Sequence, residues 1–186
     1  MTCRDMTAEL EILHWIHSFS SPGMDALMLG VTTVSTHAAV WLLAAALLIL
    51  SNRERRTGCS MVLAVLIAFT IADLVMKPLF CRERPCDLAG FELLVSVPTT
   101  YSFPSGHTAM AFAPATVLFL RDRRAGAVAL AFAALVGVSR MYLFVHWPTD
   151  VVVGALVGIV SGYVAALLTE RAAARWGRGP PGGAEG

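Results

Sequence analysis

The feature that most restricts the fold of this chain is a series of apolar segments, most of them about as long as a bilayer is thick. Five segments are separated by polar turns and loops, and they cover residues 24–50, 59–80, 105–120, 125–143 and 148–169. A helix needs about 20 apolar residues to cross a bilayer, and in lipid only helices and closed barrels satisfy every backbone polar group. We therefore predict an all-α protein, a polytopic membrane bundle of about five to six transmembrane helices.

The composition agrees with a lipid bilayer as the surrounding medium. Hydrophobic residues make up 56% of the chain and charged residues 15%, whereas soluble domains carry about 25% charged residues. The net charge of +1 gives no electrostatic basis for binding nucleic acid. Cysteines and histidines do not occur at zinc-site spacing, so we expect neither a metal nor another cofactor.

The two ends of the chain differ from its middle. Residues 1–23 predict an N-terminal amphipathic segment that lies in the membrane interface, because Leu10, Leu13 and Ile16 recur at helical spacing while Glu9 and Glu11 fall elsewhere. The charged residues in this segment are not typical of a signal peptide. We expect a membrane domain over residues 24–170 and a polar, disordered tail over residues 171–186.

The first apolar segment leaves two arrangements open. Its 27 residues exceed the length of one span. We prefer one long helix, tilted or bent, to an arrangement in which residues 24–34 lie in the interface and only the second half crosses.

The positive charges predict the orientation of the spans. Basic residues gather in three segments that five spans would place on one side of the membrane: Arg53, Arg55 and Arg56; Arg121, Arg123 and Arg124; Arg171, Arg175 and Arg178. The positive-inside rule makes that side cytoplasmic. The N-terminal helix and the loop over residues 81–103 would then face outside.

Two smaller patterns each allow two interpretations. Gly154, Gly158 and Gly162 form a small-residue stripe that lets another helix approach closely, either in a dimer or, as we prefer, within the chain. The oligomeric state stays open. Cys81 and Cys86 would form a bridge in an oxidising compartment, but two free thiols are the simpler expectation.

Polar residues concentrate in three clusters at the outer ends of the spans. They are Lys77–Pro85, Pro104–His107 and Ser139–Asp150, and the predicted topology places all three on one side. Ionisable groups at the edge of a membrane segment are costly and by default suggest a functional site. Basic anchors at the lipid interface or a paired His–Asp would explain each cluster alone, but not the three together.

The residue types in these clusters favour phosphoryl chemistry. Lys77, Arg84 and Arg140 supply positive charge, and the guanidinium fork of arginine suits phosphate oxygens. Ser105 and Gly106 would begin a helix whose free N–H groups attract an anion, with Ser105 as its N-cap. Asp73 precedes Lys77 by four residues, so the two can pair on one helix face.

Two histidines remain for bond making and breaking. Asp150 lies one turn after His146 and would orient its imidazole, leaving the other nitrogen to attack as a nucleophile. His107 would protonate the leaving oxygen.

The spacings Lys-x6-Arg-Pro (77–85), Pro-Ser-Gly-His (104–107) and Ser-Arg-x5-His-x3-Asp (139–150) resemble the three-part signature of the type 2 phosphatidic acid phosphatase superfamily. The resemblance spans about residues 60–165. It implies a helical membrane enzyme that removes a phosphate through a phosphohistidine. It assigns catalysis to His146, His107 and Asp150, and phosphate binding to Lys77, Arg84, Ser105, Gly106 and Arg140. Arg82 lies outside the strict motif, and we expect it to assist.

The small size and the Tyr-Ser-Phe before Pro-Ser-Gly-His look like the short bacterial members of this family. The resemblance therefore implies undecaprenyl diphosphate as substrate, an outward-facing site in the bacterial inner membrane and a role in recycling a cell-wall lipid carrier. Phosphatidylglycerophosphate or phosphatidic acid is the alternative substrate. A non-catalytic protein that binds a lipid headgroup is a rival from another class, and a vanadate-dependent peroxidase is the third.

Overall fold

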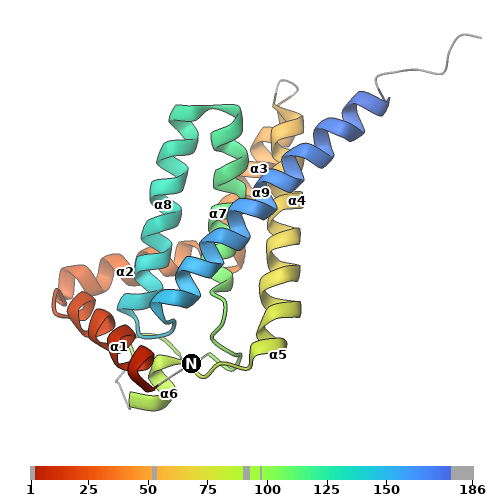
Figure 1. Ribbon diagram of the computed structural model, residues 1–186. Coiled ribbons are helices and arrows are strands. Elements are labelled where there is room, and N and C mark those ends of the chain that lie inside the picture. The colour runs from red at the N-terminus through yellow and green to blue at the C-terminus, as the bar shows by residue number, and fades with distance from the viewer. Residues whose placement is uncertain (1–2, 52–53, 90–92, 97, 177–186) are drawn as a thin grey trace, which may run out of the picture.

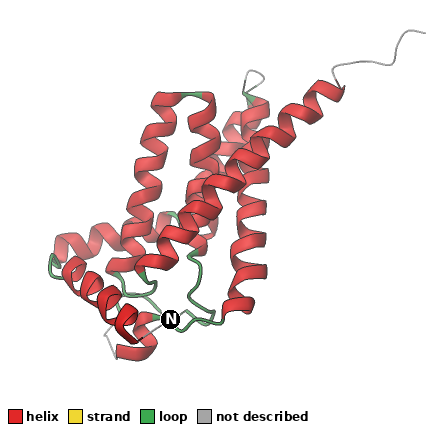
Figure 2. Ribbon diagram, viewed as in Figure 1, coloured by secondary structure: helices red, strands yellow, loops and turns green. Residues whose placement is uncertain are grey.

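Every regular element in the computed structural model is helical within the residues it describes, which are 3–51, 54–89, 93–96 and 98–176 (Figure 2). The predicted all-α class is confirmed. The α-helices are α1 Cys3–His17, α2 Pro22–Val34, α3 Ala39–Leu50, α4 Arg55–Phe69, α5 Lys77–Phe80, α6 Pro85–Ala89, α7 Gly106–Arg121, α8 Arg123–Tyr142 and α9 Pro148–Trp176. A 3₁₀ turn, Thr36–Ala38, joins α2 to α3, and a π-helical segment, Thr70–Met76, joins α4 to α5.

Three described helical segments are long and apolar enough to cross a membrane by themselves. They are Arg55–Asp87, Arg123–Tyr142 and Pro148–Arg175, and a fourth span results if α2 and α3 count as one. The helix α7 has only 16 residues, which is short for a span, yet it occupies the middle of the bundle. The membrane-protein class is therefore supported, while the count of five to six spans stays a prediction.

The first apolar segment is broken in its middle. Helices α2 and α3 meet at an angle of 50°. His37 and Ala38 take φ values of 52° and 56° at the break, in the left-handed region that a helix cannot continue through. The segment thus forms two helices and not one continuous helix, and whether both halves make one bent span or only α3 crosses the membrane stays a prediction.

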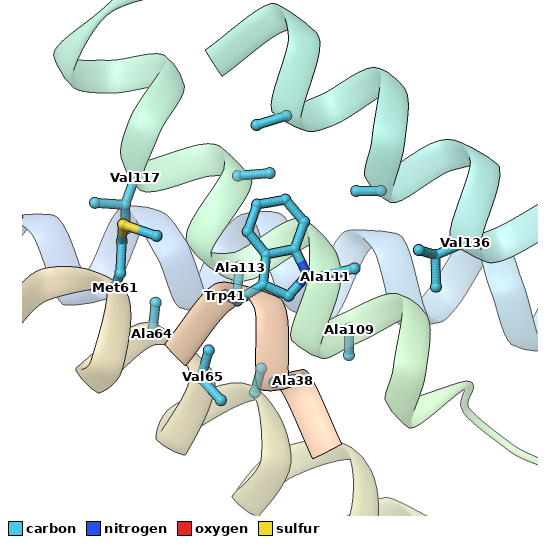
Figure 3. Packing of buried hydrophobic residues seen from close by; sticks show 14 of the residues in the cluster. Ala38, Trp41, Met61, Ala64, Val65, Ala109, Ala111, Ala113, Val117 and Val136 are labelled. Carbon is cyan, nitrogen blue, oxygen red and sulfur yellow. The ribbon is translucent and has the colours of Figure 1, made fainter. Parts of the chain in front are cut away.

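Helix α7 is the centre of the bundle, where it packs against α4, α8 and α9 (Figure 1). Its inner faces are mainly alanine, and Ala109 and Ala113 are fully buried. Larger side chains such as Trp41, Met61 and Val65 fill the remaining space from α3 and α4 (Figure 3). The small residues let the helices approach closely, which is the usual device of membrane bundles.

The glycine stripe of α9 serves this packing. A Cβ atom at Gly154 would lie 2.6 Å from the carbonyl oxygen of Ser105, and one at Gly158 would lie 2.5 Å from that of Ala109. Both distances are too short for any side chain. The stripe therefore packs against α7 inside the chain, as the sequence analysis preferred.

Two features differ from those expected. Helix α9 continues through residues 171–176, which were expected to belong to the disordered tail, and residues 177–186 lie outside the described part. The loop over residues 81–103 contains the short helix α6. Cys81 and Cys86 are free thiols, as the simpler expectation had it.

Candidate active site

All three sequence clusters meet at one end of the bundle, drawn at the bottom of Figure 1. Lys77 begins α5, Ser105 caps the start of α7, Arg140 lies in the last turn of α8, and Asp150 lies in the first turn of α9. Gly106 and His107 form the first turn of α7, and loops carry Arg84 and His146. The predicted convergence on one end is therefore observed.

His146 lies on the five-residue connection between α8 and α9 and is 1% exposed. Its Nε2 lies 3.3 Å from Nη1 of Arg84, and its Nδ1 lies 3.5 Å from Oδ2 of Asp150. Burial lowers the pKa of His146 well below its ordinary value, and the positive charges of Arg84, Arg140 and Lys77 lower that pKa further. The imidazole is therefore neutral near pH 7, the state that a nucleophile requires.

Asp150 is fully buried and accepts several hydrogen bonds. Its Oδ2 accepts from the hydroxyl of Ser102 and, at 2.9 Å, from the backbone N–H of Trp147. Its Oδ1 accepts from Nη1 of Arg82 at 2.6 Å. These bonds hold the carboxylate beside His146, where the sequence placed it.

Two members of this carboxylate network were missed or misplaced. Arg82 was expected to assist with phosphate, but the structure pairs it with Asp150 and with Glu9 of α1. Glu9 was placed away from the apolar face of its helix, yet it is buried on the same side as Leu13. The spacing of Glu9 and Leu13, one turn apart, was the only sequence signal for this arrangement.

Arg84 is 3% exposed and is held mainly by backbone carbonyls. Its Nε donates to the carbonyl of Thr100 at 2.8 Å, Nη1 to that of Val145 at 2.6 Å, and Nη2 to that of Tyr101 at 3.1 Å. The guanidinium therefore joins the loop before α7 to the loop that carries His146. Its Nη1 is the atom that approaches Nε2 of His146.

Arg140 is the least satisfied of the buried cations. Its Nη1 donates to the hydroxyl of Thr32 on α2, a contact that the sequence analysis did not foresee. Its Nε is buried and has no hydrogen-bond partner among the described residues. A buried donor of this kind suits a phosphate oxygen.

Lys77 pairs with Asp73, four residues earlier, as the spacing predicted. The Asp73 carboxylate also lies against Gly106, so close that a Cβ atom there would overlap it. Ser105 is the N-cap of α7 as predicted, and its hydroxyl accepts from the Thr108 hydroxyl at 2.8 Å. The start of α7 is thus a helix N-terminus flanked by a cation and a carboxylate.

His107 projects from the first turn of α7 and is half-buried. Four charged or titratable groups of the site interact electrostatically with it: Arg140, His146, Lys77 and Arg84. The two histidines therefore share one cluster of cations, although they come from different helices.

The chain is similar to known proteins of one family. The model of the PAP2 superfamily matches residues 57–173. An undecaprenyl-diphosphatase from Sulfolobus acidocaldarius is 36% identical over 121 residues, which are 64% of this chain and 58% of that protein. A decaprenylphosphoryl-5-phosphoribose phosphatase from Mycobacterium tuberculosis is 33% identical over 145 residues, which are 77% of this chain and 79% of that protein. The chain thus spans less than two thirds of the archaeal relative's length.

Solved structures include the same fold. The crystal structure of Aquifex aeolicus LpxE superposes with a TM-score of 0.76 at 30% sequence identity, and the match covers 89% of this chain and 98% of that one. The match therefore includes most of the helices that form the bundle.

Proposed function

This chain belongs to the PAP2 superfamily, and we propose that it is an integral-membrane lipid phosphatase that works through a phosphohistidine. The observation that carries the proposal is the environment of His146, a buried neutral imidazole with a carboxylate at Nδ1 and a guanidinium at Nε2. An imidazole held in this way is suited to nucleophilic attack on a phosphoryl group.

In this proposal the cations bind the phosphate and the helix end supports it. Lys77, Arg84 and Arg140 neutralise the phosphoryl oxygens, with the free Nε of Arg140 as one donor. Ser105 and Gly106 contribute the start of α7, whose free N–H groups would attract an anion. Stabilising the charge of the transferred group is the main task in phosphoryl transfer.

The histidines then divide the chemistry. Nε2 of His146 attacks phosphorus, the bond from phosphorus to the leaving oxygen breaks, and His107 supplies a proton to that oxygen. Asp150 stabilises the positive charge that forms on His146. A water molecule, deprotonated by His107, next attacks the phosphohistidine and releases inorganic phosphate.

For the substrate we propose undecaprenyl diphosphate, and the name of the Sulfolobus acidocaldarius relative supports this choice. The Mycobacterium tuberculosis relative is named for a different polyprenyl phosphate, which supports a polyprenyl chain without fixing the headgroup. Phosphatidylglycerophosphate or phosphatidic acid stays the second candidate. We further propose that the enzyme lies in the bacterial inner membrane with its site on the outer face, because the arginine-rich turns favour the cytoplasmic side.

The test is phosphate release by the purified full chain in detergent, with a chelator present and with undecaprenyl diphosphate, phosphatidylglycerophosphate or phosphatidic acid as substrate. We expect release from undecaprenyl diphosphate, none from the His146→Ala variant, and a trapped phosphohistidine in His107→Ala. The trap is expected because the leaving phosphate of a diphosphate needs little protonation, whereas the attacking water needs the base. Lipid binding without turnover in the parent protein, unchanged in both variants, would favour the non-catalytic rival.

A further inference from the structure

The N-terminal helix α1 lies directly against the loop that carries His146. Leu13 of α1 is fully buried and packs with Phe144 and Trp147, the residues on either side of Val145 and His146. Glu9, one turn earlier, is only 6% exposed. A carboxylate at that depth requires partners. Because the superfamily match begins at residue 57, α1 lies outside the part of the chain that the family describes.

Glu9 finds its partners at the start of α9. Its Oε1 accepts the backbone N–H of Thr149 at 3.1 Å and the hydroxyl of Thr149 at 2.5 Å. Thr149 is the second residue of α9, so Glu9 satisfies one of the free N–H groups at that helix end and interacts favourably with its dipole.

Arg82 extends this contact to the catalytic carboxylate. Its Nη2 pairs with Oε2 of Glu9, and its Nη1 donates to Oδ1 of Asp150 at 2.6 Å. The guanidinium also lies over the ring of Trp147, 5.2 Å from the centroid. Hydrogen bonds therefore run from Glu9 through Arg82 to Asp150, whose Oδ2 lies 3.5 Å from Nδ1 of His146, a nitrogen with no hydrogen-bond partner among the described residues.

We propose that Glu9 is a positioning residue for the phosphatase reaction, acting through Arg82 and the first turn of α9 to keep Asp150 directed at His146. Glu9 and Asp150 share one guanidinium, so the three groups together carry one negative charge. Without Glu9 the remaining pair would be neutral, and Asp150 would stabilise a positive His146 less well. The inference rests on the proposed phosphatase activity.

The charges around His146 set the expected effect on the pH profile. Arg84, Arg140 and Lys77 disfavour a protonated His146, as does His107 when it is charged, and Asp150 opposes them. Removing the charge of Glu9 weakens that opposition, so the pKa of His146 falls further. The acid limb in the pH dependence of kcat/KM then moves to lower pH, by about half a pH unit to one unit for the loss of one nearby charge.

The experiment compares Glu9→Gln with Glu11→Gln in the full-length protein in detergent, with undecaprenyl diphosphate and phosphatidic acid as substrates. Both variants remove one charge from α1, but Glu11 is exposed. We expect Glu9→Gln to lower kcat about ten- to a hundredfold with little change in KM, and to shift the acid limb downward. Glu11→Gln should match the parent. In the double variant with Arg82→Gln, the loss of kcat should be smaller than the product of the two single losses, because Glu9 acts partly through Arg82 and partly through Thr149.

Equal kcat and equal pH profiles for Glu9→Gln and Glu11→Gln would overturn the proposal. The proposal would also be overturned if kcat of Glu9→Gln fell only in proportion to the amount of folded protein and the acid limb of the pH profile did not move. If Glu9→Gln does not fold, Glu9→Asp serves instead: it should keep the acid limb in place while lowering kcat, and an unchanged kcat would count against Glu9. No turnover by the parent on either lipid would contradict the proposed function itself. An active parent with an unchanged Glu9→Gln variant would contradict only the role of Glu9.

Discussion

At the scale of single residues, Gly106 links the second sequence motif to the first through Asp73, which lies outside both. Its Cα faces the carboxylate of Asp73, which is also the partner of Lys77. The sequence predicted the Asp73–Lys77 pair from its spacing, but it held no sign that this pair would lie against the start of α7. The small size of Gly106 is therefore needed for the position of Asp73 and Lys77 and, under the proposed function, also for the approach of a phosphate.

Replacing Gly106 with alanine should test this contact. The new Cβ would overlap the Asp73 carboxylate, so Asp73 and Lys77 must move. We expect kcat/KM for lipid phosphate to fall about a hundredfold, since a displacement of about 1 Å in a positioning group has an effect of this size. The control is Gly30→Ala on α2, where a Cβ would meet nothing within 4 Å. Equal kcat/KM values for the two variants would show that a side chain is tolerated at Gly106 and would contradict this prediction.

At the scale of elements, the break between α2 and α3 sets where α2 meets the site. Thr32 of α2 receives the Arg140 hydrogen bond, and the left-handed residues His37 and Ala38 follow one turn later. A left-handed conformation costs a residue with a Cβ roughly 1–2 kcal/mol. The two left-handed residues lie where the chain changes direction between α2 and α3.

The substitution Ala→Gly should destabilise the protein less at Ala38 than at Ala44. Ala38→Gly removes the strain of a left-handed residue, and this gain offsets the greater entropy of glycine in the unfolded chain. The free energy of unfolding should therefore rise, or fall by less than about 1 kcal/mol. Ala44→Gly lies within α3, where glycine costs about 1 kcal/mol relative to alanine. Thermal unfolding in detergent measures both. A larger loss for Ala38→Gly than for Ala44→Gly would contradict the assignment of the break.

At the scale of the whole molecule, the two ends of the bundle have different chemistry. One end holds the buried charged cluster around His146. At the other end Arg121 of α7 pairs with Glu54 at 3.0 Å, and Arg123 begins α8. Because exposed arginines favour the cytoplasmic side, this asymmetry supports a site on the outer face.

Cysteine labelling should report that orientation. Cys81 is exposed at the site end, whereas Cys59 is exposed near the start of α4 at the other end. In intact cells a membrane-impermeant maleimide should label a variant that keeps only Cys81 and should not label one that keeps only Cys59. Permeabilised cells provide the control for access. Labelling of Cys59 alone in intact cells would reverse the proposed topology.

Much of this protein could be predicted before its structure was known, because the relevant signals are local. Apolar length predicts helices in lipid regardless of how those helices pack. The three motifs likewise lie within short stretches, so their residue types and spacing were enough to predict one polar cluster around His146, Asp150 and Arg140. The glycine stripe is also a local signal, because glycines at a spacing of four residues leave one face of a helix without side chains. It therefore predicted close packing against another helix.

Only the tertiary structure decided which groups complete the cluster. Arg82 and Glu9 are 73 positions apart, Arg82 and Asp150 are 68 apart, and Arg140 and Thr32 are 108 apart. Such pairs depend on the angle between α2 and α3 and on the docking of α1, which arise from the packing of whole helices and leave no periodic trace in the sequence. The sequence by itself therefore determined a set of polar motifs at the ends of membrane helices, and the fold determined that a carboxylate from the N-terminal helix joins the network around His146.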